Sequence, residues 1–255
     1  MKLSVYIVTL NEEKRLEKPL QAVQQVADEI LIVDSGSTDK TKEIAEKYNA
    51  KFIFHKWKNI SSQKKFAQDT CENDFVLSLD ADEVLSPRLI EEINQVKSNQ
   101  KYKAYKIKIK DMYPNDKKPK IFAKSYNLVR LYDRNVATMP DDLTHDRVVF
   151  KEETEIGQLS NIVYHYSYIS LTQSWYKYNM YTDELLKTYI TKGKKYSKFR
   201  LITEMPYQFF RYYILKRQCL NGWFGFINSV LVPFFRFLKI AKWVEYDLSR
   251  KNSSK

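Results

Sequence analysis

The sequence predicts an α/β protein with a mixed sheet, helices on both sheet faces, and a C-terminal helical extension rich in aromatic residues. Apolar runs of strand length alternate with helical patterns through the first 80 residues. This alternation is typical of a parallel sheet that is covered on both faces. From residue 170 onward, apolar and aromatic side chains recur every three or four residues, which predicts helices.

The first half should contain four buried strands and the helices between them. We expect strands at 3–8, 30–33, 51–54 and 75–79, and helices at 14–27, from about 40 to 48, and at 61–72. Ser37 or Thr38 is suited to cap the second helix. Within 105–109, apolar residues alternate with lysines, as in a half-exposed strand. Further strands are expected at 126–132, 147–150 and 161–166. These later strands predict an antiparallel extension of the same sheet.

Composition narrows the classes of function. The 255 residues carry a formal net charge of +12, so we expect an anionic partner such as nucleic acid, a membrane surface or a phosphorylated substrate. Only 5 glycines occur, and no glycine-rich phosphate loop is present. Cys71 and Cys219 lack zinc-like spacing, which favours a reducing compartment and free, buried thiols.

No signal peptide or membrane-spanning segment is expected. The apolar run 3–10 leads directly into charged residues without a small-residue cleavage site. The run 223–235 is almost wholly apolar but is interrupted by Asn228 and Pro233. It is either a core helix or an aromatic, cationic segment that lies in the headgroup region of a membrane.

An acidic cluster follows the fourth predicted strand. Asp80, Asp82 and Glu83 stand where an apolar run ends, and buried carboxylates without partners are costly. The stretch alone allows two interpretations: Asp80 and Asp82 hold a divalent metal against a diphosphate, or the acidic residues, Glu83 above all, cap the next helix.

Polar residues also follow the first two strands. Thr9, Asn11 and Glu12 come after the first strand and Asp34 after the second. Because parallel strands end at the same edge of a sheet, we expect these residues to converge with Asp80 and Asp82. Such groups can bind a ribose and a nucleobase, and hard oxygen ligands suit Mg²⁺ or Mn²⁺.

Three motifs, at residues 4–13, 34–39 and 79–83, together resemble glycosyltransferase family 2. These are inverting enzymes of the GT-A fold, a Rossmann-like architecture, that use nucleotide-diphosphate sugars. Residues 130–134, 144–146 and 165–167, with Trp57, Gln63 and the aromatic stretch 222–225, resemble the subgroup that adds glucose to the lipopolysaccharide inner core.

The resemblance implies roles for particular residues. Thr9, Asn11, Glu12 and Asp34 would hold the uridine of the donor. Asp80 would contact the ribose, the metal or a metal-bound water, whereas Asp82 and His145 would ligate the metal. Donor contacts are also implied for Gln63 and Arg130, and Arg134 either binds phosphate or forms a surface salt bridge.

Inversion requires a base that deprotonates the acceptor hydroxyl on the sugar face opposite the leaving diphosphate. Asp146 is the first choice. The subgroup more often has the longer glutamate at this position, so Asp142 is kept as the second choice. His55 and His165 are assigned mainly to structure.

The predicted domains are a transferase domain at 1–168 and a helical extension at 169–255, which either packs as a core or contacts membranes. The predicted activity is metal-dependent transfer of a hexose, glucose in the first place, from a UDP-sugar to a lipopolysaccharide-core or other lipid-linked acceptor. We expect a peripheral location on the inner face of the cytoplasmic membrane and no nucleic-acid partner. The alternatives are a polyprenyl-phosphate or protein acceptor, a basic nucleic-acid-binding protein, and an inactive GT-A scaffold.

Overall fold

The structure is a computed structural model that describes residues 1–141 and 147–252. The chain forms two compact units. One, which we call the sheet unit, comprises Met1–Met112 and Lys124–Ser167, and the other, the helical unit, comprises Tyr113–Ala123 and Tyr168–Lys255. The helical unit therefore begins within one residue of the expected boundary, but it also includes residues 113–123, which the sequence placed in the transferase domain.

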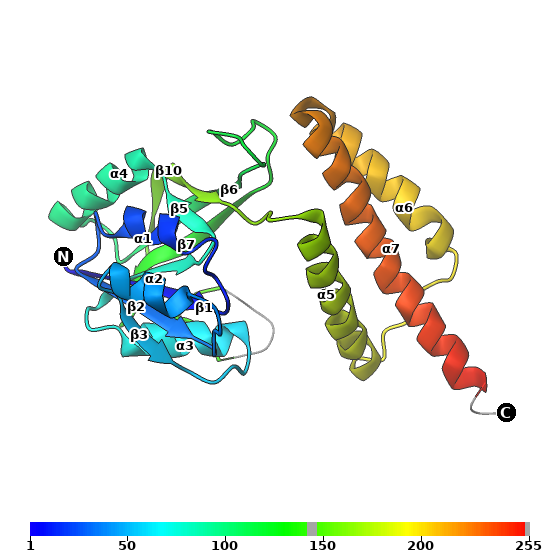
Figure 1. Ribbon diagram of the computed structural model, residues 1–255, viewed down its shortest axis with the longest axis horizontal. Helices are drawn as coiled ribbons and strands as arrows, with labels where there is room; N and C mark the ends of the chain where they lie inside the picture. Colours follow the sequence, from blue (N-terminus) through cyan, green and yellow to red (C-terminus); the bar gives the residue numbers. More distant parts are fainter. Residues whose placement is uncertain (142–146, 253–255) are drawn as a thin grey trace. The chain divides into compact units, whose positions relative to one another are not determined.

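An eight-stranded mixed sheet in the order β3-β2-β1-β4-β7-β6-β10-β5 forms the sheet unit (Figure 1). Its strands are β1 (Leu3–Thr9), β2 (Glu29–Asp34), β3 (Lys51–Phe54), β4 (Phe75–Asp80), β5 (Glu83–Leu85), β6 (Ala104–Asp111), β7 (Ser125–Asp133) and β10 (Ile156–His165). The first four strands in this order are parallel, β7 is antiparallel to both of its neighbours, and β5 is antiparallel to β10. A separate pair joins β8 (Ala137–Thr138) to β9 (Val149–Phe150). The predicted mixed sheet is confirmed. Its extension is not wholly antiparallel, however, because β10 runs parallel to β6, and residues 149–150 belong to the separate pair rather than to the same sheet.

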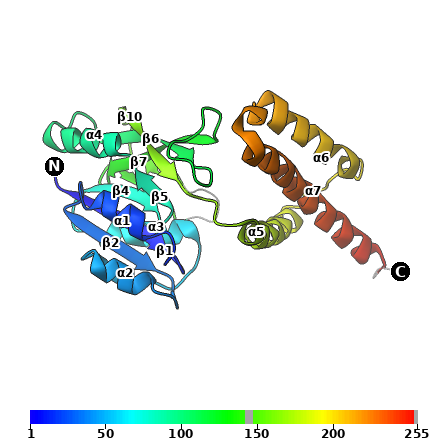
Figure 2. The same cartoon turned by 45° about the horizontal axis from the view of Figure 1, so that its top comes forward.

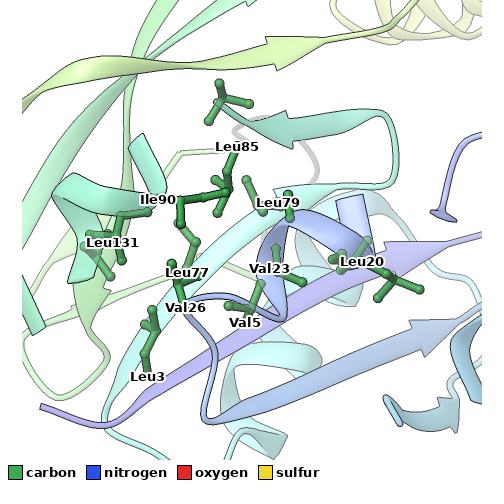
Figure 3. Close-up of a cluster of buried hydrophobic side chains, with 14 of the residues drawn as sticks. Leu3, Val5, Leu20, Val23, Val26, Leu77, Leu79, Leu85, Ile90 and Leu131 are labelled. Atoms are coloured by element: carbon green, nitrogen blue, oxygen red, sulfur yellow. The ribbon is translucent and has the colours of Figure 1, made fainter. Parts of the chain in front are cut away.

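Helices cover both faces of this sheet. They are α1 (Glu17–Val23), α2 (Thr41–Lys47), α3 (Ile60–Thr70) and α4 (Pro87–Ser98). On one face, side chains of α1 and α4 pack against those of β1 and β4, as Figure 3 shows for Leu20, Val23 and Ile90. On the other face, Ala67 and Cys71 pack with Tyr6 and its neighbours. Burial on both sides explains why β1 is apolar along almost its whole length.

Two predictions of helix capping are wrong. Ser37 and Thr38 do not cap α2, because Ser37 Oγ donates to Asp34 and the Thr41 amide at the helix start is bound by Asp39, at 3.0 Å. Glu83 does not cap a helix either, since it lies in β5 and is 2% exposed. The cap of α4 is Ser86, whose side chain accepts from the Leu89 amide at 3.3 Å.

The strand ends meet at one edge, as the sequence predicts. Thr9 at the end of β1 pairs in register with Asp34 at the end of β2. On the other side of β1, Val8 pairs with Asp80 at the end of β4. The polar residues that follow these three strands therefore share one edge of the sheet.

Long helices dominate the helical unit (Figure 2). They are α5 (Leu171–Thr191), α6 (Arg200–Phe210) with its continuation η1 (Arg211–Leu215), η2 (Gln218–Asn221) and α7 (Gly222–Asn252). Both α5 and α6 pack on α7. Residues 113–123 join this unit through Tyr113, whose hydroxyl donates to Gln218 at 2.8 Å and accepts from Asn221 at 3.1 Å.

The apolar run 223–235 is not a separate segment, because α7 continues through Pro233. Within the described residues, Gln218–Lys251 is one helical stretch that is long and apolar enough to cross a membrane, with a mean hydropathy of 1.4 in its most apolar window, of which only 28% is buried. Length and composition are weak grounds for a span, since core helices share them. Of the two thiols expected to be buried, Cys71 is buried but Cys219 is exposed.

Candidate active site

Asp34 organises the loop that follows β2. Its carboxylate accepts from Thr9 Oγ1 at 2.8 Å and from the backbone amides of Gly36 and Ser37 at 2.8 and 2.7 Å. The residue is 2% exposed. The structure thus brings Thr9 and Asp34 together at the expected edge, where Asp34 holds the loop in shape.

The loops after β1 and β2 are joined by hydrogen bonds around Asn11. This residue has a φ of 56°, a left-handed conformation that asparagine tolerates better than most residues. Its side-chain oxygen accepts from the Thr38 amide at 2.9 Å, and its own amide donates to Ser37 Oγ at 2.7 Å. Glu12 adds a bond from its amide to Thr41 Oγ1 at 2.8 Å. The two loops therefore form one hydrogen-bonded rim.

Asp80 belongs to a buried network of two carboxylates and two cations. Lys64, which is fully buried, lies 2.8 Å from Asp80, and Arg130 lies 3.3 Å from Asp80 and 2.8 Å from Glu83. Burial alone would raise the pKa of Asp80, but the charges of Lys64 and Arg130 outweigh it and hold the pKa well below its usual range. For Glu83, burial outweighs Arg130 and raises the pKa to about 7.

Asp82 lies in a second cluster, between the β1 loop and the end of β10. Arg15 Nη1 is 3.2 Å from Asp82 Oδ2, and Arg15 Nη2 is 2.6 Å from Glu12 Oε1. On the other side, His165 Nε2 is 3.5 Å from Asp82 Oδ1, and His165 Nδ1 is 2.7 Å from Asp111. Burial would lower the pKa of His165, but its two carboxylate neighbours raise it to about 10.

The chemistry of Asp82 and His165 fits a divalent cation. A ligating histidine commonly donates its second ring N–H to a carboxylate, and Asp111 occupies that position here. The 3.5 Å between Asp82 Oδ1 and His165 Nε2 is close to the roughly 3 Å between neighbouring ligands of an octahedral Mg²⁺. Among the described residues no group of three potential ligands converges, so Asp82 and His165 are the two candidates in this part of the chain, and the predicted ligand His145 lies outside it. Mg²⁺ sites of this kind are completed by substrate phosphates and water.

The other predicted site residues are placed differently. Gln63 is fully buried, and its amide binds the ring and the carbonyl of His55 at 2.9 and 3.0 Å. Its side chain is therefore held by His55, which directly follows β3 and whose amide donates to Asp34 O at 2.8 Å. The predicted donor contact of Gln63 stays a prediction. Arg134 donates to backbone carbonyls at the C-terminal end of α3, among them that of Cys71 at 2.5 Å. His145, Asp146 and Asp142 lie outside the described residues.

Arg130 is 6% exposed and borders a cavity of about 260 Å³. Other residues that line it are Ser78, Lys106, Asn127, Met139 and Arg147. Three cations around one cavity favour an anionic or hydroxyl-rich group. The predicted donor role of Arg130 stays a prediction, because its guanidinium also holds Asp80 and Glu83.

Sequence reasoning missed Lys64, Arg15, Asp111 and His165. His165 was assigned to structure, yet it lies beside Asp82. A signal was available, since Asp111 follows the predicted strand 105–109 by two residues and His165 lies near the end of the predicted strand 161–166, so both could have been added to the strand-end residues. The buried Lys64 had no such signal, because a lysine in a helical pattern is ordinarily solvated.

The model of the family "Glycosyl transferase family 2" matches residues 4–140, more than half of the chain. An uncharacterized glycosyltransferase from Rickettsia conorii is 39% identical over 98% of this chain and 93% of its own length. The chain belongs to glycosyltransferase family 2, and its mixed sheet with a parallel half is a GT-A fold.

More distant similarities were also found. The lipopolysaccharide core biosynthesis glycosyltransferase LpsC of Rhizobium meliloti is 25% identical over 94% of this chain and 91% of its own length. Among solved structures, S. aureus TarS gives a TM-score of 0.49 at 21% identity, covering 73% of this chain and 40% of that chain.

Proposed function

We propose that this glycosyltransferase moves a hexose, glucose in the first place, from a UDP-sugar to a lipopolysaccharide-core or other lipid-linked acceptor, with inversion at the anomeric carbon. The observation that carries the donor side is the Asp82–His165–Asp111 arrangement at the edge where β1, β2 and β4 end. The acceptor class is supported by the similarity to LpsC over nearly the whole chain. A polyprenyl-phosphate or protein acceptor is the alternative.

In this proposal Asp82 and His165 hold Mg²⁺ or Mn²⁺. When bound, the cation would offset the negative charge of the departing diphosphate. Arg15 keeps Asp82 in place from the opposite side, and Asp111 orients the imidazole of His165. Asp80 remains a proposed ribose or metal contact, although both of its oxygens already face cations.

The rim formed by the loops after β1 and β2 would bind the uridine. Thr9, Asn11, Glu12 and Asp34 all lie in or beneath this rim. Asp146 would take the proton from the acceptor hydroxyl, on the sugar face opposite the leaving diphosphate, and Asp142 is the second choice for this role.

We further propose that the protein is peripheral on the inner face of the cytoplasmic membrane, through its helical unit. Large apolar side chains there are strongly exposed, among them Ile202 at 73%, Leu215 at 65% and Trp223 at 85%. Exposed aromatic and aliphatic groups among many cations are typical of a surface that binds anionic lipids.

The first experiment is a thermal-shift screen of nucleotide sugars with and without Mn²⁺, followed by a UDP-release assay on purified lipopolysaccharide cores. We expect UDP-glucose with Mn²⁺ to raise Tm and to support transfer, and EDTA to abolish both effects. A shift that EDTA leaves intact would contradict the metal assignment. If only another nucleotide sugar raises Tm, that sugar rather than UDP-glucose is the donor.

The base is tested by Asp146→Asn, with Asp142→Asn as the matched variant. Because the base acts on the acceptor, we expect Asp146→Asn to lose transfer while keeping the donor-induced shift in Tm. Retained turnover in Asp146→Asn, together with its loss in Asp142→Asn, would move the role to Asp142.

A further inference from the structure

The helical unit contains a cavity of about 370 Å³ beside the connection between α5 and α6. Five of the residues that line it are cations: Lys194, Lys195, Arg200, Arg236 and Lys239. Tyr189 and Tyr196 complete the lining. The cations come from the connection, from α6 and from α7, so the tertiary structure assembles the cluster.

Local geometry at the end of α5 brings the first of these cations into place. Gly193, with a φ of +61°, ends the helix, its amide bonds to Ile190 O at 3.1 Å, and the Lys194 amide bonds to Tyr189 O at 3.0 Å. This is a Schellman motif, which reverses the chain direction at a left-handed residue. The Lys194 ammonium consequently lies over the Tyr189 ring, 5.4 Å from its centroid.

The two arginines are held by one buried carboxylate. Glu204 is 5% exposed and lies 2.5 Å from Arg200 and 2.8 Å from Arg236. A single carboxylate neutralises one unit of charge, so four positive charges remain around the cavity. Among the described residues, no ion pair to a carboxylate is recorded for the three lysines.

Two of the lysines lie over the ring faces of the tyrosines, and a neutral ring does not cancel the positive charge of an ammonium group. The Lys239 ammonium lies 5.3 Å from the Tyr189 centroid and 5.6 Å from that of Tyr196, at cation–π distance. The hydrogen bond with Tyr196 lowers the pKa of Tyr189, and Lys239 and Lys194 lower it further. The lysines lower the pKa of Tyr189 because their charges make the electrostatic potential inside the cavity positive.

We propose that this cavity binds a phosphomonoester or diphosphate group. Two oriented guanidinium groups and three lysine ammonium groups are the donors that proteins use for phosphate oxygens. A volume of about 370 Å³ falls within the range of small-molecule sites, roughly 300–1,000 Å³. The cavity contains none of the residues proposed for sugar transfer, so this proposal can be tested independently of the proposed function. The group is either a membrane headgroup or a phosphate on a soluble or acceptor-borne molecule.

The test uses the full-length protein in EDTA, so that no divalent cation supports binding at the strand-end edge. Pyrophosphate binding is measured by titration calorimetry for the wild type, for Lys194→Gln/Lys239→Gln, and for the control Lys177→Gln/Lys216→Gln. The control removes the same charge from the same unit but outside the cavity. We expect the cavity variant to bind at least about tenfold more weakly and the control to match the wild type.

A second arm measures sedimentation with phosphatidylcholine vesicles that contain phosphatidic acid. Loss of vesicle binding in the cavity variant but not in the control assigns the site to a lipid headgroup. Equal vesicle binding with weaker pyrophosphate binding assigns it to a phosphate outside the bilayer. If the cavity and control variants are indistinguishable in both arms, the proposal is wrong. Far-UV circular dichroism and Tm confirm that each variant is folded.

Discussion

The sheet unit and the helical unit differ most in where their charge and apolar surface lie. The helical unit has 19 Lys and Arg residues against 6 Asp and Glu, whereas the sheet unit has 24 against 25. The excess positive charge of the chain is therefore confined to the helical unit. Of the 25 large apolar side chains exposed among the described residues, 19 also belong to that unit.

The net charge of the whole chain hides a difference between the two units in how their cations are placed. Around its strand ends the sheet unit keeps three cations in contact with carboxylates, namely Lys64, Arg130 and Arg15. The helical unit leaves cations and aromatic groups facing outward around a small core of Ile240, Trp243 and Val244. The first arrangement suits a reaction site, and the second suits binding to an anionic surface or group.

The largest effect is expected from a substitution in the candidate active site of the sheet unit. Asp82→Asn should lower transfer by about 10³-fold, because stabilisation by a bound metal amounts to several kcal/mol. The control is Asp74→Asn, a 68% exposed carboxylate just before the opposite end of β4. Activity is measured by UDP release and folding by Tm. Equal activity in the two variants would remove Asp82 from the metal site.

The buried ion network gives the next largest effect. Lys64→Met leaves Asp80 without its nearest cation, which should cost about 2 kcal/mol of unfolding free energy, less than the 3–5 kcal/mol for a fully buried pair because a third of the Asp80 side chain is exposed. Its neighbour Lys65 forms a surface pair with Asp69, so Lys65→Met should cost less than about 0.5 kcal/mol. Urea unfolding followed by circular dichroism compares the two. Equal costs would show that the network does not stabilise the sheet unit.

Exposed tryptophans test the assignment of membrane binding to one unit. Trp223→Ser should weaken partitioning to anionic vesicles about tenfold, since an exposed indole in the helical unit would lose its burial in the interface. Trp57→Ser removes a 52% exposed tryptophan from the sheet unit and should leave partitioning unchanged. Vesicle sedimentation measures both. Similar losses in the two variants would contradict a division of tasks between the units.

The smallest effect concerns pH and Glu204. Burial would raise the pKa of Glu204, but Arg200 and Arg236 outweigh it and lower the pKa below the unfolded value. The stability that Glu204 contributes is thus present above about pH 4.5 and is lost as the pH falls through the folded pKa. Glu204→Gln should melt about 3 °C below wild type at pH 7, and this gap should narrow as the pH falls below about 4.5.

Tryptophan fluorescence reports this transition, because three of the four tryptophans, Trp175, Trp223 and Trp243, lie in the helical unit. Measurements in a Trp57→Phe background make the signal specific to that unit. A gap that does not change with pH would exclude Glu204 as its source.

Much of the fold followed from the sequence because burial and strand direction leave local patterns. Apolar runs predicted the parallel strands, and the alternation of lysines at 105–109 predicted β6. The capping predictions for Ser37, Thr38 and Glu83 were wrong because each side chain found a partner elsewhere. The Ser37 hydroxyl donates to Asp34, the Thr38 hydroxyl lies 3.5 Å from the side-chain oxygen of Asn11, and Glu83 pairs with Arg130.

By itself, the sequence determined that carboxylates would gather where β1, β2 and β4 end, because strands that run in one direction end at one edge. Only the tertiary structure decided which cation meets which carboxylate. Arg15 meets Asp82 across 67 residues of chain, His165 meets Asp111 across 54, and Arg236 meets Glu204 across 32. Such pairings leave no periodicity in the sequence. They arise when packing of apolar faces brings distant polar side chains together, and each charge that becomes buried must then be matched by a neighbour.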